Sequence, residues 1–126
     1  MTDVALFGAG RIGKIHAGNL VRQPDVKLKY VVDVDAGAAK TLADAHGAKV
    51  ADGDAVFGDA TVKVIVIASS TDTHADLILR AAAAGKAIFC EKPVDLALDR
   101  ARTCAQAVAR AGVPCLIGFS AENVGS

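Results

Sequence analysis

Short apolar runs rich in β-branched residues alternate along the chain with longer, alanine-rich segments. Apolar runs of this length, bounded by glycine, proline or acidic residues, are typical of buried strands. Residues 64–67 are apolar on both faces, as in the centre of a parallel sheet. The pattern predicts strands at residues 4–7, 28–32, 49–50, 62–68, 87–90 and 114–118.

The alanine-rich segments predict helices. In the first of them, Ile12, Ile15 and Leu20 fall on roughly one helical face. Glycine directly follows the other three, as is common where a helix ends, and Asp72 or Thr73 is placed to cap the third segment. The predicted helices are residues 12–21, 36–46, 73–84 and 98–111, with one helical turn inside the loop 52–61.

This alternation of strands and helices predicts an α/β fold, with a parallel sheet covered by helices on both faces. Because crossovers between parallel strands are right-handed, we expect a doubly wound, Rossmann-type sheet of six strands in the order 3-2-1-4-5-6. Neither a repeat nor a linker divides the chain, so residues 1–120 form one predicted domain, and residues 121–126 form a polar tail without pattern.

Composition excludes several classes of protein. The 126 residues carry 14 basic and 14 acidic side chains, which is not the balance of a nucleic-acid binder. Aromatic residues, at 4%, are too few for base-stacking platforms. No apolar run approaches the roughly 20 residues of a membrane helix, and the N-terminus lacks the basic region of a signal peptide. We therefore expect a cytoplasmic protein that binds neither nucleic acid nor membrane.

The three cysteines, Cys90, Cys104 and Cys115, are odd in number and widely spaced. Such spacing fits reduced thiols better than a disulfide framework or a zinc site, so we predict no metal site. Each cysteine is expected to be a small, buried side chain.

The segment Gly8-Ala-Gly-Arg-Ile-Gly13 matches the pattern G-x-G-x-x-G between the first predicted strand and the first predicted helix. Gly8 permits the tight turn, Gly10 lets a diphosphate approach the backbone, and Gly13 allows close packing of the helix. The helix start, with Arg11 and Ile12, turns unpaired N–H groups toward the phosphates. The Arg11 side chain is also placed to contact the diphosphate. These five residues are predicted to bind a dinucleotide.

Asp33 lies twenty residues after Gly13, at the end of the second predicted strand. An acid at this place accepts hydrogen bonds from the adenosine ribose and repels a 2′-phosphate. The following residues, including Val34 beside the adenosine, supply no cation for such a phosphate, so NAD is favoured over NADP. Asp35 either helps to hold the ribose or begins the next helix, and we favour the second role.

Other nucleotide-binding motifs fit less well. A glycine-rich turn followed by an acid also occurs in methyltransferases that bind S-adenosylmethionine, but the third glycine and the second half of the chain argue against them. A P-loop is excluded because no G-K-[ST] follows the glycines.

Small hydroxyl residues follow the fourth predicted strand, where the strand order reverses and a crevice opens. Ser69, Ser70 and Thr71, together with His74, are predicted to contact the second nucleotide of the cofactor. Ser69, Asp72 and His74 are too close in sequence for a hydrolase triad, and no G-x-S-x-G motif precedes them. His74 also lacks the partner cluster of a metal ligand.

Three stretches, residues 8–16, 68–75 and 90–94, carry a resemblance to a known family. They read Gly-Ala-Gly-Arg-Ile-Gly-Lys-Ile-His, Ala-Ser-Ser-Thr-Asp-Thr-His-Ala and Cys-Glu-Lys-Pro-Val. From about residue 2 to residue 119, the chain resembles the glucose–fructose oxidoreductase / inositol dehydrogenase family, and within it most of all the inositol 2-dehydrogenases.

The resemblance implies oxidation of a CH–OH group of a cyclic polyol, with NAD as the cofactor. Lys92 is then the catalytic residue: it lies at the nicotinamide, hydrogen-bonds the reacting oxygen, stabilises developing charge and relays a proton. Glu91 holds the ribose beside the nicotinamide, and Lys92 and Pro93 complete this cofactor-binding segment. His16 is interpreted as a structural residue packed near the glycine turn, in preference to a catalytic one.

Members of the family continue into a second domain that carries a catalytic histidine and aspartate and most of the substrate pocket. After Gly118 and Phe119, this sequence departs from the family and soon ends. We therefore expect an isolated dinucleotide-binding half that binds NAD(H) but turns over a polyol slowly or not at all without a second domain. The alternative is a non-enzymatic nucleotide-binding module, a sensor or a scaffold. An uncovered apolar face predicts self-association as a homodimer.

Overall fold

The computed structural model describes residues 1–91 and 98–118. Its centre is a sheet of six strands in the order β3-β2-β1-β4-β5-β6, and each neighbouring pair is parallel. This is the predicted order, so the doubly wound α/β fold is confirmed. The strands are β1 (Thr2–Phe7), β2 (Val26–Val32), β3 (Lys49–Val50), β4 (Val62–Ile67), β5 (Ala87–Glu91) and β6 (Cys115–Gly118).

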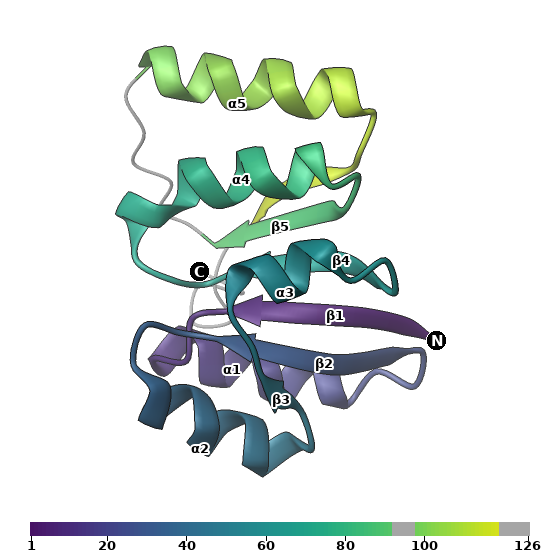
Figure 1. Ribbon diagram of the computed structural model, residues 1–126, viewed down its shortest axis with the longest axis vertical. Coiled ribbons are helices and arrows are strands. Elements are labelled where there is room, and N and C mark those ends of the chain that lie inside the picture. Colours follow the sequence, from purple (N-terminus) through teal and green to yellow (C-terminus); the bar gives the residue numbers. More distant parts are fainter. Residues whose placement is uncertain (92–97, 119–126) are drawn as a thin grey trace.

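The helices divide the molecule into two halves. In Figure 1, α1 and α2 lie beside β1, β2 and β3, whereas α4 and α5 lie beside β4 and β5. The halves meet where β1 pairs with β4. The helices are α1 (Arg11–Val21), α2 (Ala36–His46), α3 (Gly53–Gly58), α4 (His74–Ala83) and α5 (Leu98–Ala111), with a short 3-10 turn, η1 (Thr71–Thr73), before α4.

Two apolar clusters cover the two faces of the sheet. Because successive side chains of a strand point to opposite faces, β1 contributes to both clusters. Ala5 and Phe7 join the cluster that α3, α4 and α5 close, whereas Val4 and Leu6 join the cluster that α1 and α2 close. The sheet is therefore covered by apolar side chains on both sides.

Most predicted boundaries agree with the structure to within two residues. The helical turn expected between residues 52 and 61 is α3, and Asp52 caps it by accepting a hydrogen bond from the N–H of Ala55 at 2.8 Å. Gly47 and Gly85 follow α2 and α4 with φ of 70° and 71°, the left-handed conformation expected where a helix ends.

The predicted capping of α4 is wrong. Thr73 immediately precedes the helix, but its side chain makes no capping hydrogen bond, and Asp72 lies within η1. The Thr73 hydroxyl instead donates to the carbonyl oxygen of Ser70 and pairs with the hydroxyl of Ser69, each at 2.7 Å. Thr73 thus holds the loop after β4 and not the helix.

Cys90 and Cys104 are buried as expected, and burial raises the pKa of the Cys90 thiol to about 12. The prediction that Cys115 is buried is wrong, because β6 forms the outer edge of the described sheet and leaves this thiol exposed. Among the described residues, none of the helices is long and apolar enough to cross a membrane. The same residues contain no group of three or more His, Cys, Asp or Glu side chains placed to hold a metal ion.

Candidate functional site

A groove opens at the carboxyl ends of β1, β2 and β4, where the strand order reverses. Doubly wound sheets bind their ligands at this switch point. The groove has a volume of about 300 Å³. Its lining comes from the glycine turn, the end of β2 and the loop after β4: Gly8, Gly10, Asp33, Val34, Ala68, Ser69, Ser70 and Thr73. All of these except Ala68 and Thr73 are residues that the sequence predicts to bind the cofactor.

The glycines of the turn each have a distinct structural reason. Gly8 has φ of +109°, and a Cβ there would lie 2.5 Å from the carbonyl carbon of Ala68, so β4 also requires this glycine. A Cβ on Gly13 would collide with the carbonyl oxygen of Gly8, so the helix packs against the turn as predicted. By contrast, a Cβ on Gly10 would meet nothing within 4 Å. The fold itself does not need a glycine there, and the open space fits a ligand that approaches the backbone.

The start of α1 has the features of a phosphate site. Gly10 precedes the helix and provides no side-chain cap, and the first turn holds no acidic residue. Helix geometry directs the first N–H groups of a helix outward at its start, and in α1 the N–H of Lys14 is bonded to the carbonyl oxygen of Gly10 at 2.9 Å. The positive end of the helix dipole adds to their attraction for an anion. The residues present therefore fit the diphosphate of a dinucleotide.

Asp33 is locked onto the glycine turn. Its Oδ2 accepts a hydrogen bond from the N–H of Ala9 at 2.6 Å, and its Oδ1 accepts one from the N–H of Asp35 at 2.8 Å. Because each carboxylate oxygen has two lone pairs, both can still accept a ribose hydroxyl. Asp35 accepts from the N–H of Ala38 at 3.0 Å and caps α2, which settles its role as the start of that helix. The side chain of Val34 is fully exposed at the groove.

Side chains of the loop after β4 hold one another in place. The Ser69 hydroxyl pairs with that of Thr73, and His74 Nε2 lies 3.0 Å from the carbonyl oxygen of Ser69. Since a carbonyl only accepts, Nε2 donates, and in the neutral ring Nδ1 is then the acceptor. His74 is 2% exposed, and its Nδ1 has no hydrogen-bond partner among the described residues. The ring therefore bonds the Ser69 backbone and not its hydroxyl, which is not the arrangement of a hydrolase triad.

A second acidic side chain lies at the end of β5. Glu91 is 4% exposed, and its Oε2 pairs with Nε2 of His16 from α1. The His16 ring also meets the edge of Phe89, with ring centroids 5.5 Å apart. The other carboxylate oxygen, Oε1, is buried and has no partner within residues 1–91 and 98–118. His16 thus joins the helix of the glycine turn to β5, a contact that its expected place near the turn did not reveal.

A separate polar cluster lies toward the amino ends of the strands, away from the groove. Asp59, before β4, accepts from Lys29 Nζ at 2.7 Å and from the Tyr30 hydroxyl at 2.8 Å. These bonds, with two more from Thr61, hold the pKa of Asp59 well below its usual range. Lys86 is buried and donates to the carbonyl oxygens of Asp59 and Val62, and its burial lowers its pKa.

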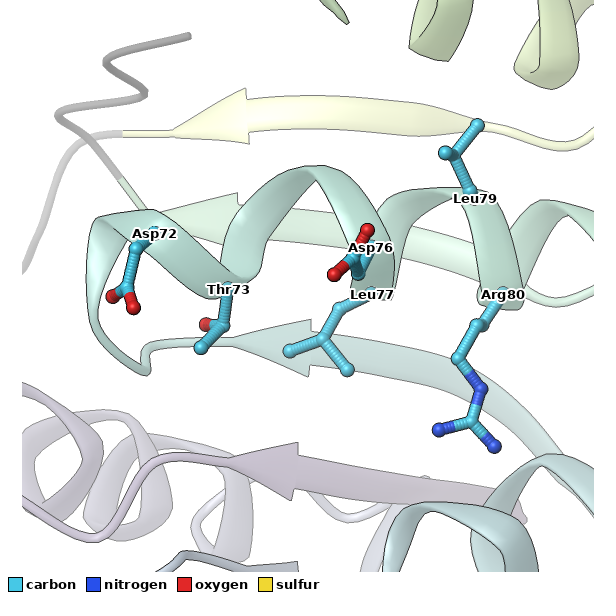
Figure 2. Close-up of a pocket in the computed structure, with 6 residues that line it drawn as sticks. All are labelled: Asp72, Thr73, Asp76, Leu77, Leu79 and Arg80. Carbon is cyan, nitrogen blue, oxygen red and sulfur yellow. The ribbon is translucent and has the colours of Figure 1, made fainter.

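A second hollow lies along η1 and α4, and Figure 2 shows the residues that line it. It measures about 610 Å³. Arg80 projects from the helix along it, bonds Asp54 of α3 at 2.5 Å and lies over the ring of Phe57. Its lining residues are Asp72, Thr73, Asp76, Leu77, Leu79 and Arg80. It shares only Thr73 with the groove at the glycine turn, and none of the predicted cofactor-binding residues lines it.

Residues 2–119 match the family described as an oxidoreductase family with an NAD-binding Rossmann fold. This is the family of the glucose–fructose oxidoreductases and inositol dehydrogenases. The chain belongs to it. The fold of this family is NAD-binding, so NAD as the cofactor and the resemblance carried by the three motif stretches are confirmed.

Individual members of the family agree with this assignment. An inositol 2-dehydrogenase of Rhizobium meliloti is 46% identical over 115 residues, which are 91% of this chain and 35% of that protein. The crystal structure of a putative myo-inositol dehydrogenase from Sinorhizobium meliloti is 44% identical with a TM-score of 0.90, and covers 94% of this chain and 36% of its own. GenD2 from gentamicin A biosynthesis, solved in complex with NAD, is 36% identical with a TM-score of 0.89, over 93% of this chain and 34% of its own. The chain thus spans about a third of the length of these family members.

Some family-derived site residues are not placed by the structure. Lys92 and Pro93 lie outside the described residues, and of Thr71 only the backbone, within η1, is described. Arg11 begins α1 as an exposed residue, and Ile12 is half-buried beside it. Sequence reasoning missed the Asp33–Ala9 and His16–Glu91 contacts. The signals in the sequence that could have indicated the second contact are an acid at the end of β5 and a histidine one turn into α1.

Proposed function

We propose that the chain binds NAD(H) in the groove at the glycine turn, as the cofactor-binding part of an inositol 2-dehydrogenase-like oxidoreductase. The observation that carries this proposal is the groove at the switch point of the sheet, because it brings the glycine turn, Asp33 and the loop after β4 together as the sequence predicts. Bound NAD⁺ supplies an acceptor for the hydride that leaves the carbinol carbon of a cyclic polyol. The inositol dehydrogenases among the relatives support this substrate class.

For the adenosine half, we propose that Gly8, Gly10 and the first N–H groups of α1 bind the diphosphate, with Arg11 adding a cation. Asp33 accepts hydrogen bonds from the ribose hydroxyls, and Val34 lies against the adenine side. The carboxylate of Asp33 would repel a 2′-phosphate, so NAD(H) is preferred to NADP(H).

For the nicotinamide half, Ser69, Ser70, Thr71 and His74 line the pocket, and Glu91 holds the second ribose. Lys92, next to Pro93, is the proposed catalytic residue and hydrogen-bonds the reacting oxygen. A cation there stabilises the charge that develops on this oxygen as the hydride leaves, and relays the hydroxyl proton.

We propose that polyol oxidation also needs a second domain, because the chain spans about a third of the length of its inositol dehydrogenase relatives. The protein is expected to be cytoplasmic. It is also expected to form a homodimer, and Leu116, 60% exposed on the edge strand β6, supports such an apolar contact. Sedimentation at tens of micromolar tests this point, and a monomeric mass would count against it.

The proposal is tested by calorimetric titration of the chain with NADH and NADPH, in the wild type and in Asp33→Asn. The wild type should bind NADH saturably and NADPH much more weakly. Because a hydrogen bond to a charged group is lost, Asp33→Asn should weaken NADH about tenfold to a hundredfold and NADPH by a smaller factor, since the repulsion of the 2′-phosphate is lost as well. A folded chain that binds neither nucleotide would sink the proposal. NADH binding without polyol oxidation, even when a relative's second domain is supplied, would favour a sensor or scaffold.

A further inference from the structure

We propose that His16 is a positioning residue for the nicotinamide half of the cofactor, and that it acts through Glu91. The inference rests on the proposed NAD(H) binding. It adds a role for His16, whose contacts are with β5 and not with the glycine turn. It explains why a histidine of α1 contacts a residue 75 positions away.

The two halves of the sheet place an acid at corresponding positions. Phe7 of β1 and Ile67 of β4 pair with each other. The residue after the β2 partner of Phe7 is Asp33, and the residue after the β5 partner of Ile67 is Glu91. A doubly wound fold is built from two halves, each of which binds one mononucleotide. Asp33 in the first half and Glu91 in the second therefore correspond to the first and the second ribose of a dinucleotide.

The two carboxylates are held in different ways. Backbone N–H groups of Ala9 and Asp35 hold Asp33, whereas a side chain, His16, holds Glu91. Glu91 is almost wholly buried, and a buried carboxylate without a partner is strongly unfavourable. His16 supplies that partner on Oε2, while its ring packs against Phe89 of the same strand.

The remaining carboxylate oxygen points to a ligand. Oε1 of Glu91 is buried and unpartnered among the described residues, although such atoms are nearly always satisfied. A ribose hydroxyl is a donor of the right kind. With Oε2 fixed by His16, the carboxylate keeps one orientation and offers Oε1 to the second ribose. Without His16, nothing shown in the structure would hold the Glu91 carboxylate in this orientation.

Titration with three ligands separates a role at the second ribose from a structural role that would affect all ligands equally. ADP lacks the second ribose, ADP-ribose contains it, and NADH adds the nicotinamide. His16→Leu removes the donor but keeps apolar contact with Phe89, so it should weaken ADP-ribose and NADH about tenfold to a hundredfold and leave ADP unchanged. His16→Gln places an amide N–H where Nε2–H lay and should restore most of the affinity. His46→Leu, the same substitution in the last turn of α2, should change none of the three affinities.

A double-mutant cycle tests the route through Glu91. Glu91→Gln should weaken the same two ligands, and adding His16→Leu to it should have little further effect. In the wild type, the His16 ring resonances should shift on adding ADP-ribose but not on adding ADP, which requires no variant to fold.

The contrary outcomes are distinct. If His16→Leu weakens ADP as much as NADH, or changes no ligand, or if the two substitutions add fully, the inference fails. Resonances of His16 that respond equally to ADP and ADP-ribose would also overturn it. A wild type that binds neither NADH nor ADP would instead overturn the proposed function.

Discussion

At the amino ends of the strands, Asp59 accepts four hydrogen bonds and Lys86 donates to two carbonyl oxygens. At the carboxyl ends, Glu91 and His74 are buried, yet each keeps one polar atom without a partner in the described part of the chain. The same sheet therefore ends in a saturated hydrogen-bond network on one side and in unused acceptors on the other.

This difference between the two ends of the sheet suggests that the amino ends contribute to stability and the carboxyl ends to binding. A saturated network has no acceptor left for a ligand, so its contribution is to the free energy of unfolding. Unpartnered buried acceptors are unfavourable until something donates to them, and the proposed cofactor would be such a donor. Substitutions at the amino ends should change stability and leave affinity unchanged, whereas substitutions at the carboxyl ends should change affinity, with or without a change in stability.

The largest effect is expected from Gly13→Ala, which disrupts the glycine turn at the carboxyl end of β1. Its Cβ would collide with the carbonyl oxygen of Gly8, and both are backbone-fixed. We expect loss of saturable NADH binding in calorimetry, together with a loss of about 1–3 kcal/mol in the free energy of unfolding. Gly18→Ala in the same helix is the matched control, because a Cβ there meets nothing within 4 Å. It should stabilise the chain by about 0.5–1 kcal/mol and keep NADH affinity.

A smaller effect is expected from Lys86→Met, which removes a hydrogen-bond donor from the network at the amino ends of the strands. The carbonyl oxygens of Asp59 and Val62 lose their donor, so the free energy of unfolding should fall by about 1–3 kcal/mol in denaturant titrations. NADH affinity should not change. Lys63→Met, an exposed lysine of β4, is the control. A variant of Lys86 that loses NADH affinity at unchanged stability would contradict the separation of the two ends.

The smallest effect is expected in the pH dependence of stability, to which Asp59 contributes at the amino ends of the strands. Hydrogen bonds from Lys29, Tyr30 and Thr61 lower the pKa of Asp59 below its ordinary value of 3.8. The unfolded chain therefore binds this proton first, and the stabilisation is present above that value and lost as pH falls through the lower, folded pKa. Asp59→Asn should be less stable than the wild type at neutral pH, and the difference in unfolding free energy should shrink in acid. A difference that is independent of pH would argue against an ionised Asp59.

Local signals were enough to predict the fold. Glycine marked the ends of α2 and α4, apolar runs marked the strands, and right-handed crossovers left few sheet orders to choose from. Predictions failed where a side chain had a competing partner or a strand lay at an edge. Thr73 bonds Ser69 and Ser70 instead of capping, and Cys115 is exposed because β6 is outermost.

The site was predicted less completely than the fold. The glycines and Asp33 follow a spacing that reflects one local unit, so they could be read along the chain. The contact between His16 and Glu91 joins α1, which follows β1, to β5, which lies two strands away from β1 in the sheet, and no local pattern encodes that contact. Contacts of this kind become visible only once the register of β1, β4 and β5 is known.

The bond between Asp33 and the N–H of Ala9 has a consequence for engineering the cofactor preference. Exchanging Asp33 for a small residue, the obvious first step toward accepting a 2′-phosphate, would also remove the acceptor that fixes the glycine turn. A successful redesign therefore needs two changes at once: a cation near the adenosine ribose and a new acceptor for Ala9. In this chain, the choice of dinucleotide and the shape of the phosphate loop are inherited together.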